Sequence, residues 1–172
     1  MMAKLVALGL CGAMTTAQAA DFPICWTGAN GYTMTGQMRI DPVALDKKIV
    51  TEQDIVAFKI AGYHDGRLLG TWDMAELDAG DTWHVRFDLR SREFLTGGSF
   101  RTARSQGWNA DGGVSDCGNP GFGFNSGNFA QDICVNGTFI ADSSIPPDTP
   151  LPATACESAL LMSKAPKTNH SD

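Results

Sequence analysis

The residues best suited to contact a ligand lie in one glycine-rich stretch, residues 107–134. It holds seven glycines, four asparagines and three phenylalanines, with one cysteine at position 117 and another at its C-terminal end, position 134. Phe122 and Phe124 are two residues apart, so both rings leave one side of an extended segment. Aromatic rings pack on the apolar faces of sugars while amides hydrogen-bond the hydroxyls. The stretch therefore predicts a glycan-binding platform made of Trp108, Asn119, Phe122, Phe124, Asn125 and Asn128.

The same stretch is also consistent with a structural role. The phenylalanines would then fill one open end of a β-sheet domain, and the glycines would allow a crowded path. Substitution by alanine separates the two interpretations, because removing a buried phenylalanine costs several kcal/mol, about 3–5, and removing an exposed one does not. For Phe122 and Phe124 we expect the loss of stability.

A second cluster has the chemistry of a calcium site. Asp73, Glu76, Asp78 and Asp81 lie within nine residues that include no basic side chain. Calcium takes six to eight oxygen ligands. The spacing fits no EF-hand, and residues 109–113 begin like such a loop without its closing glutamate. The acids are a candidate calcium site, with a solvated acidic loop as the alternative.

Catalytic signals are sparse. The chain has three histidines, His64, His84 and His170, and no GxSxG motif for a nucleophilic serine. A pair of carboxylates would suffice for glycoside hydrolysis, and their separation is set by tertiary structure. We therefore expect a non-enzymatic binding or structural module, with a small glycosidase-like secreted hydrolase as the alternative.

The first twenty residues have the organisation of a secretory signal peptide. Lys4 precedes an apolar run over residues 5–14, and residues 17–19, Ala-Gln-Ala, form a cleavage site. Cleavage after Ala19 or Ala20 predicts a soluble secreted or periplasmic protein. No later stretch is long and apolar enough to span a bilayer.

The cysteines fit export. Outside the signal there are four, which in an exported chain indicates two disulfides with three connectivities open. No pair has the short spacing of a zinc site. We expect Cys117–Cys134, bracketing the glycine-rich stretch, and Cys25–Cys156, joining the C-terminal segment to the first strand.

The negative charge of the chain disfavours some classes of binding partner. The formal net charge is −6 at pH 7. Nucleic acids and anionic membrane surfaces attract basic patches, so neither is an expected partner. An extracellular glycan or a cell-envelope component remains as the expected partner.

These residues must be positioned by strands, because the apolar period is two. Met34, Met38 and Ile40 alternate with polar residues, and His64-Asp65-Gly66 offers a hairpin turn. About seven or eight short strands predict an all-β, antiparallel sandwich or barrel-like domain. The last strands are expected over residues 93–96, 99–103 and 133–140, and a helical turn over 41–45. The β domain is assigned to residues 21–142, and residues 143–172 to a proline-rich segment with a short helix over 153–163 and a disordered tail.

One strand predicts its two faces most clearly. The residues expected to be buried are Trp83, Val85, Phe87 and Leu89. Those expected in solvent are His84, Arg86, Asp88 and Arg90. A strand with one buried face alternates in this way.

Overall fold

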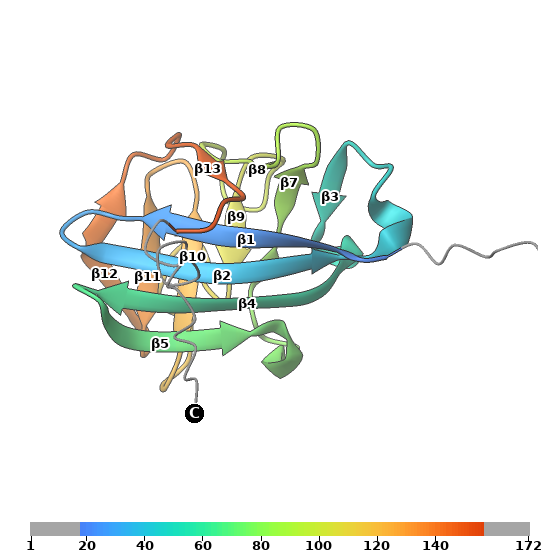
Figure 1. The fold of residues 1–172 in the computed structure, drawn as a ribbon. Helices are drawn as coiled ribbons and strands as arrows, with labels where there is room; N and C mark the ends of the chain where they lie inside the picture. The colour runs from blue at the N-terminus through green and yellow to red at the C-terminus, as the bar shows by residue number, and fades with distance from the viewer. Residues whose placement is uncertain (1–17, 157–172) are drawn as a thin grey trace, which may run out of the picture.

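Four long strands form the first sheet, in the order β1–β2–β4–β5 (Figure 1). Their bounds in the computed structural model, which describes residues 18–156, are Ala20–Thr27, Tyr32–Ile40, Ile55–His64 and Arg67–Asp73. Met34, Met38 and Ile40 point into the core, as their spacing predicted. Asp65 and Gly66 both have positive φ, so the predicted turn between β4 and β5 is confirmed.

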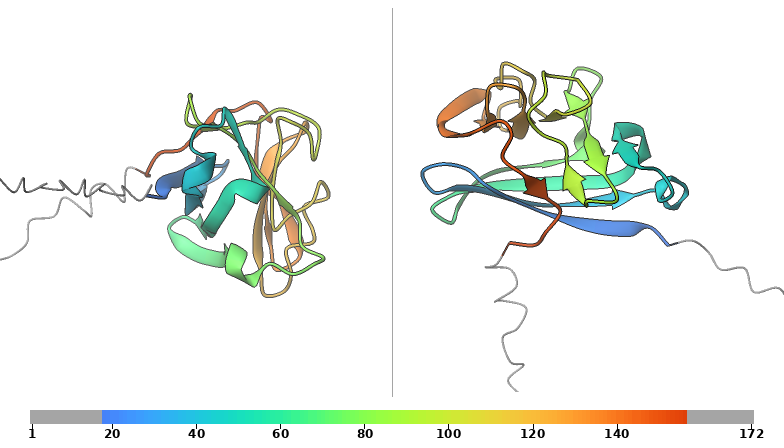
Figure 2. Two further views of the ribbon diagram at one scale, coloured as in Figure 1. Left: turned by 90° about the vertical axis from the view of Figure 1, so that its right-hand side faces the viewer. Right: turned by 90° about the horizontal axis from the view of Figure 1, so that it is seen from above.

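The other strands form two further antiparallel sheets on one side of the first (Figure 2). The five-stranded sheet has the order β12 (Thr138–Ile145), β11 (Gln131–Val135), β10 (Phe122–Ser126), β9 (Gln106–Trp108) and β6 (Trp83–His84). The remaining sheet has the order β13 (Leu151–Pro152), β8 (Glu93–Phe94), β7 (Arg86–Asp88) and β3 (Ile49–Thr51). Short 3-10 turns lie at Pro42–Ala44, Glu52–Asp54 and Met74–Glu76.

The predicted fold class is confirmed: the described chain is an all-β, sandwich-like arrangement of antiparallel sheets. It has thirteen strands rather than seven or eight, because several are only two or three residues long. Residues 99–103 form turns rather than a strand, since the Thr102 amide donates back to Ser99 O and Ser105 Oγ. The strands continue past residue 142 to Pro152, which lies in an edge strand where proline is tolerated.

Two sequence-based assignments fall largely or wholly outside the described residues. Residues 1–17 of the signal segment and 157–172 of the C-terminal segment are not described, which leaves the helix over 153–163 and the tail as predictions. Residues 153–156 have no helical conformation. No helix within residues 18–156 is long and apolar enough to cross a membrane.

The core lies between the first sheet and the other two, and it is rich in aromatic rings. Phe58 from β4 packs at 4.9 Å from the Trp108 ring of β9, and the Phe94 ring of β8 lies 5.0 Å from the same indole. Trp108 thus joins all three sheets. The largest fully buried side chains include Phe58, Phe87, Phe94, Trp108, Phe122 and Phe124.

The predicted alternation over residues 83–90 is only partly correct. Val85 and Phe87 are buried and Arg90 is exposed, as expected, but His84 is also buried. The reason is that the chain changes sheets at Val85: β6 pairs with β9, whereas β7 pairs with β3 and β8. Trp83, Arg86, Asp88 and Leu89 are consequently half-buried. A change of sheet interrupts the two-residue period.

Both predicted disulfides are present. Cys117–Cys134 joins residues 17 apart in sequence, and Cys25–Cys156 joins residues 131 apart. The first ties the glycine-rich loop to β11. The second ties the C-terminal segment to β1.

Candidate functional site

The three aromatic rings of the predicted platform are core residues. Trp108, Phe122 and Phe124 are fully buried, so no ligand reaches them in this structure. The Phe124 ring lies 5.3 Å from Trp26 and 4.8 Å from Trp108. The exposed platform is therefore wrong for these rings, and their burial agrees with the structural alternative, under which substitution of Phe122 or Phe124 by alanine is expected to lower stability. They are inaccessible because β10 is covered on both faces, by the first sheet on one side and by loop 109–121 on the other.

Two of the predicted asparagines do meet at a cavity, which we call the Asp132 pocket. Its volume is about 230 Å³, and it lies on the outer face of the five-stranded sheet. Asn125 and Asn128 line it, whereas Asn119 is exposed elsewhere, before a cis proline. The other side chains that define the pocket are Phe100, Val114, Phe129, Asp132 and Phe139.

The floor of the Asp132 pocket is a cross-strand pair. Asn125 of β10 stands directly opposite Asp132 of β11, and the two are only 5% and 4% exposed. Asn125 Nδ2 donates to Asp132 Oδ1 at 3.3 Å, and Ser144 Oγ donates to Asp132 Oδ2 at 3.5 Å. Among the described residues, Asn125 Oδ1 has no hydrogen-bond partner although it is buried. Such an atom costs free energy unless water or a ligand satisfies it.

Burial also perturbs the acid on this floor. Desolvation raises the pKa of the Asp132 carboxyl, and the hydrogen bonds from Asn125 and Ser144 offset only part of that rise. A carboxyl with a raised pKa in a cavity is a frequent property of functional sites. Asp132 is thus the residue of this pocket with the most unusual environment.

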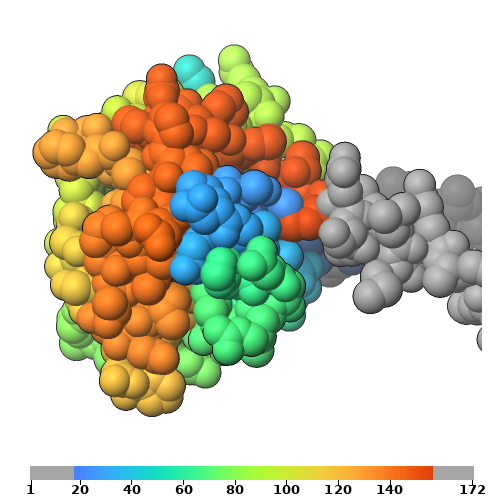
Figure 3. Space-filling model, turned by 90° about the vertical axis from the view of Figure 1, so that its left-hand side faces the viewer, coloured from blue at the N-terminus to red at the C-terminus, as the bar shows by residue number. Residues whose placement is uncertain are grey.

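Exposed aromatic rings form the walls. Phe129, in the turn between β10 and β11, is 90% exposed, and Phe139 on β12 is 43% exposed. Figure 3 shows this turn, in light orange at the upper left, protruding beside β12. The Phe100 ring packs against Gly112, where an added Cβ would lie 3.2 Å from the ring. Phe129 and Phe139 are therefore the rings most available to a ligand.

The glycine-rich loop supplies the remaining wall. Asn109 Nδ2 donates to the carbonyls of Cys117 and Phe122 at 3.0 Å each, and the Cys117–Cys134 disulfide fastens the loop to β11. Ala110 and Val114 pack with this disulfide on the sheet. Val114 has a φ of 53°, an unusual conformation for a β-branched residue. The loop is thus a folded cover that ends at the pocket.

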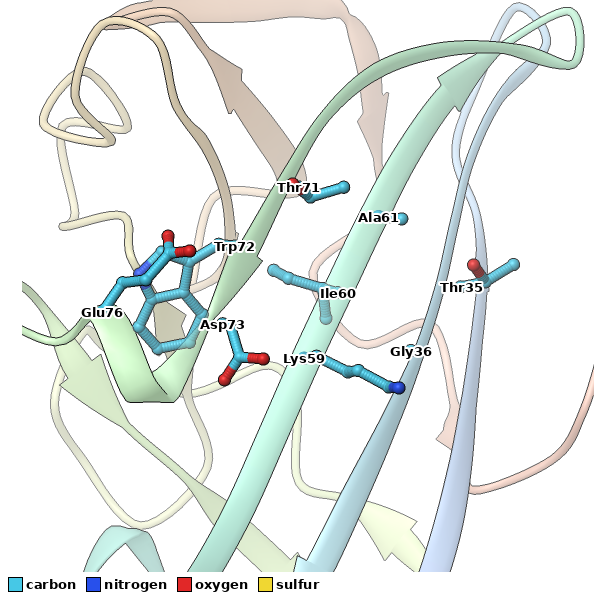
Figure 4. Close-up of a pocket in the computed structure, with 9 residues that line it drawn as sticks. All are labelled: Thr35, Gly36, Lys59, Ile60, Ala61, Thr71, Trp72, Asp73 and Glu76. Carbon is cyan, nitrogen blue, oxygen red and sulfur yellow. The ribbon is translucent and has the colours of Figure 1, made fainter.

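A second hollow lies over β2, β4 and β5, with a volume of about 330 Å³ (Figure 4). Lys59 of β4 and Asp73 of β5 are partners in the strand register, but the Lys59 side chain points away from Asp73, towards β2, and Glu76 lies at one end of the hollow. Trp72 lines the hollow but is only 5% exposed, so its face is not free for stacking. This surface lacks the exposed aromatic rings of the Asp132 pocket.

Two of the four acids of the predicted calcium site, Asp73 and Asp81, stabilise local turns. Asp73 Oδ1 accepts from the Ala75 amide and caps Met74–Glu76, and Asp81 Oδ2 accepts from the Asp78 amide. Across residues 18–156, no three acidic, histidine or cysteine side chains converge on a position suited to a metal ion. We build no calcium site on Asp73, Glu76, Asp78 and Asp81.

The two described histidines pack against neighbouring groups. His64 stacks on Tyr32 with the ring centres 4.2 Å apart. His84 Nε2 lies 2.9 Å from Thr102 O, and burial lowers the pKa of this imidazole. His84 is therefore held neutral near pH 7, in a structural setting.

Comparison of the chain with protein-family models, with curated proteins and with solved structures found no match. The Asp132 pocket is therefore the feature of the described chain from which a function is inferred.

Proposed function

We propose that the protein is a non-enzymatic binding module that holds a hydroxylated, glycan-like ligand in the Asp132 pocket. One observation carries the proposal: the exposed Phe129 and Phe139 rings flank a buried Asn125–Asp132 pair with an unpartnered amide oxygen. Rings of this kind pack on the apolar C–H faces of sugars, and buried acceptors orient the hydroxyls.

The chemistry of the lining favours binding over hydrolysis. Glycoside hydrolysis uses two carboxyl groups, about 5–5.5 Å apart in retaining enzymes and about 6.5–9.5 Å apart in inverting ones. Asp132 is the one carboxylate among the described residues that line the pocket. A single acid can orient a hydroxyl, but it does not provide the acid–nucleophile or acid–base pair.

We place this binding outside the cytoplasm. Two disulfides in one domain of this size are typical of proteins in an oxidising compartment. The signal-like segment over residues 1–20 supplies the route of export. A secreted or periplasmic protein meets extracellular glycans and envelope polysaccharides, which are the proposed ligands.

The experiment is a glycan array followed by titration calorimetry, with Phe129→Ala as the test variant. Because the ring is 90% exposed, its removal should weaken binding at least about tenfold while leaving the melting temperature unchanged. Val43→Ala is the matched control, since Val43 is 85% exposed and does not line the pocket. Absence of binding to every glycan, or equal affinity of wild type and Phe129→Ala, would reject the proposal.

A further inference from the structure

The floor of the Asp132 pocket offers acceptors and no cation. Asn125 Oδ1 and the Asp132 carboxylate both accept hydrogen bonds, and the lining contains no lysine, arginine or histidine among the described residues. The Asp132 carboxyl is desolvated by burial, and the side chains that donate hydrogen bonds to it are those of Asn125 and Ser144. Arg101 lies nearby, but its guanidinium is over the Phe100 ring at 5.3 Å.

We propose that the pocket selects glycans that carry a free amino group, with the ammonium bound between Asp132 and Asn125 Oδ1. This inference rests on the proposed function and names the class of sugar that the site takes. The ammonium donates one hydrogen bond to the Asp132 carboxylate and one to the unpartnered amide oxygen. Phe129 and Phe139 flank the same ligand.

Electrostatics favours this ligand over a neutral or acidic one. A carboxylate that is 4% exposed and has no cationic partner is poorly solvated, and an incoming cation supplies the missing charge. The faces of aromatic rings also attract cations. An acidic sugar would instead place its charge against Asp132, in a protein whose net charge is already −6.

The test compares three β-1,4-linked tetrasaccharides by titration calorimetry, at a pH where the amine is charged. They are the tetramers of glucosamine, N-acetylglucosamine and glucose. We expect the glucosamine tetramer to bind at least about tenfold more tightly than the other two. Its affinity, unlike theirs, should fall at high salt, because salt screens an ion pair.

Asp132→Asn should remove the preference for the amine, so that this variant binds the glucosamine and glucose tetramers with affinities within about twofold of each other. Asp78→Asn removes the same charge from an exposed loop and should leave the preference intact, which excludes a general effect of net charge. The comparison of ligands on the wild-type protein needs no variant, so it decides the question even if Asp132→Asn fails to fold.

The two proposals fail in different ways. Equal affinity for all three tetramers, or a preference that survives in Asp132→Asn, would overturn the amino-sugar inference and leave glycan binding in place. Absence of binding to all three, together with a blank glycan array, would overturn the proposed function as well. Ethanolamine that binds as tightly as the amino sugar would support the ammonium site and contradict the glycan.

Discussion

Phe124 and Phe129 belong to the same hairpin and have opposite environments. The ring of Phe124 is fully buried against Trp26 and Trp108, whereas that of Phe129 is in solvent. We expect Phe124→Ala to lower the free energy of unfolding by about 3–5 kcal/mol, because it leaves a cavity in the core. Phe129→Ala should change it by less than about 0.5 kcal/mol. Urea unfolding measures both, and equal losses would contradict this assignment of core and surface.

The second prediction at the scale of the residue concerns pH. Because burial raises the folded-state pKa of Asp132, its ionisation opposes folding at neutral pH. That penalty is complete above the raised pKa, falls as the carboxyl protonates, and is gone below the unfolded value near 3.8, where both states carry the proton. Asp132→Asn should therefore melt at a higher temperature than wild type at pH 7.

The difference between the two proteins should shrink as the pH approaches 4, and thermal melts at several pH values will show it. A carboxyl whose pKa is lowered in the folded state has the opposite effect, because its ionisation stabilises the fold. The backbone amides of Arg90 and Ser91 hold the pKa of Asp88 below its usual value, so the stability that ionised Asp88 contributes is lost only as the pH falls through that lowered pKa. A constant gap between wild type and Asp132→Asn across the pH range would contradict the role given to burial.

At the scale of elements, β4 and β10 pack through a glycine. A Cβ added at Gly62 would lie 2.0 Å from the Phe122 ring. The two sheets therefore approach each other too closely at this position for any residue that has a side chain. Gly62→Ala should cost about 1–3 kcal/mol or more, because it overpacks a dense core. Gly80→Ala is the matched control, since nothing lies within 4 Å of its added Cβ and its effect should be near zero. Chemical denaturation of the two variants is the measurement.

The same scale explains which elements sequence reasoning finds. The β4–β5 hairpin follows from a local signal, the turn residues Asp65-Gly66. The 3-10 turn at Pro42–Ala44 follows from another, the proline at its first position. The burial of His84 does not, because it depends on a change of sheet that leaves no local mark. Residues 99–103 have the composition of a strand, but their backbone forms hydrogen bonds within a local turn instead of pairing with another strand.

Only part of the candidate site could be predicted from the sequence, because its residues come from separate strands. Asn125 and Asn128 were predicted from composition, whereas Phe129 and Phe139 were missed. The length of the turn between β10 and β11 does carry a signal for the Asn125–Asp132 pair. A hairpin closed at Ser126 and Gln131 places Asn125 opposite Asp132. The burial of Phe122 and Phe124 depends on the first sheet, which is distant in sequence.

At the scale of the whole molecule, the Cys25–Cys156 disulfide closes a loop over nearly the whole described domain. In the chain-entropy model a loop of that length contributes about 5 kcal/mol, and the shorter Cys117–Cys134 loop about 3. We expect the Cys25→Ser/Cys156→Ser variant to lose more stability than Cys117→Ser/Cys134→Ser. Only the second variant should also lose ligand affinity, since that disulfide fastens a wall of the Asp132 pocket. Melting curves and calorimetry on both variants test the two statements.

The nested order of these two bonds has a consequence for how the protein matures. The four cysteines that form disulfides are synthesised in the order Cys25, Cys117, Cys134 and Cys156, and the native pairs are first with last and second with third. Oxidation in the order of synthesis would join Cys25 to Cys117, a bond that must be exchanged before folding ends. Refolding of the reduced protein should therefore be accelerated by a thiol–disulfide isomerase more than by an oxidant alone. The chain would then depend on disulfide reshuffling, as well as on oxidation, to become active.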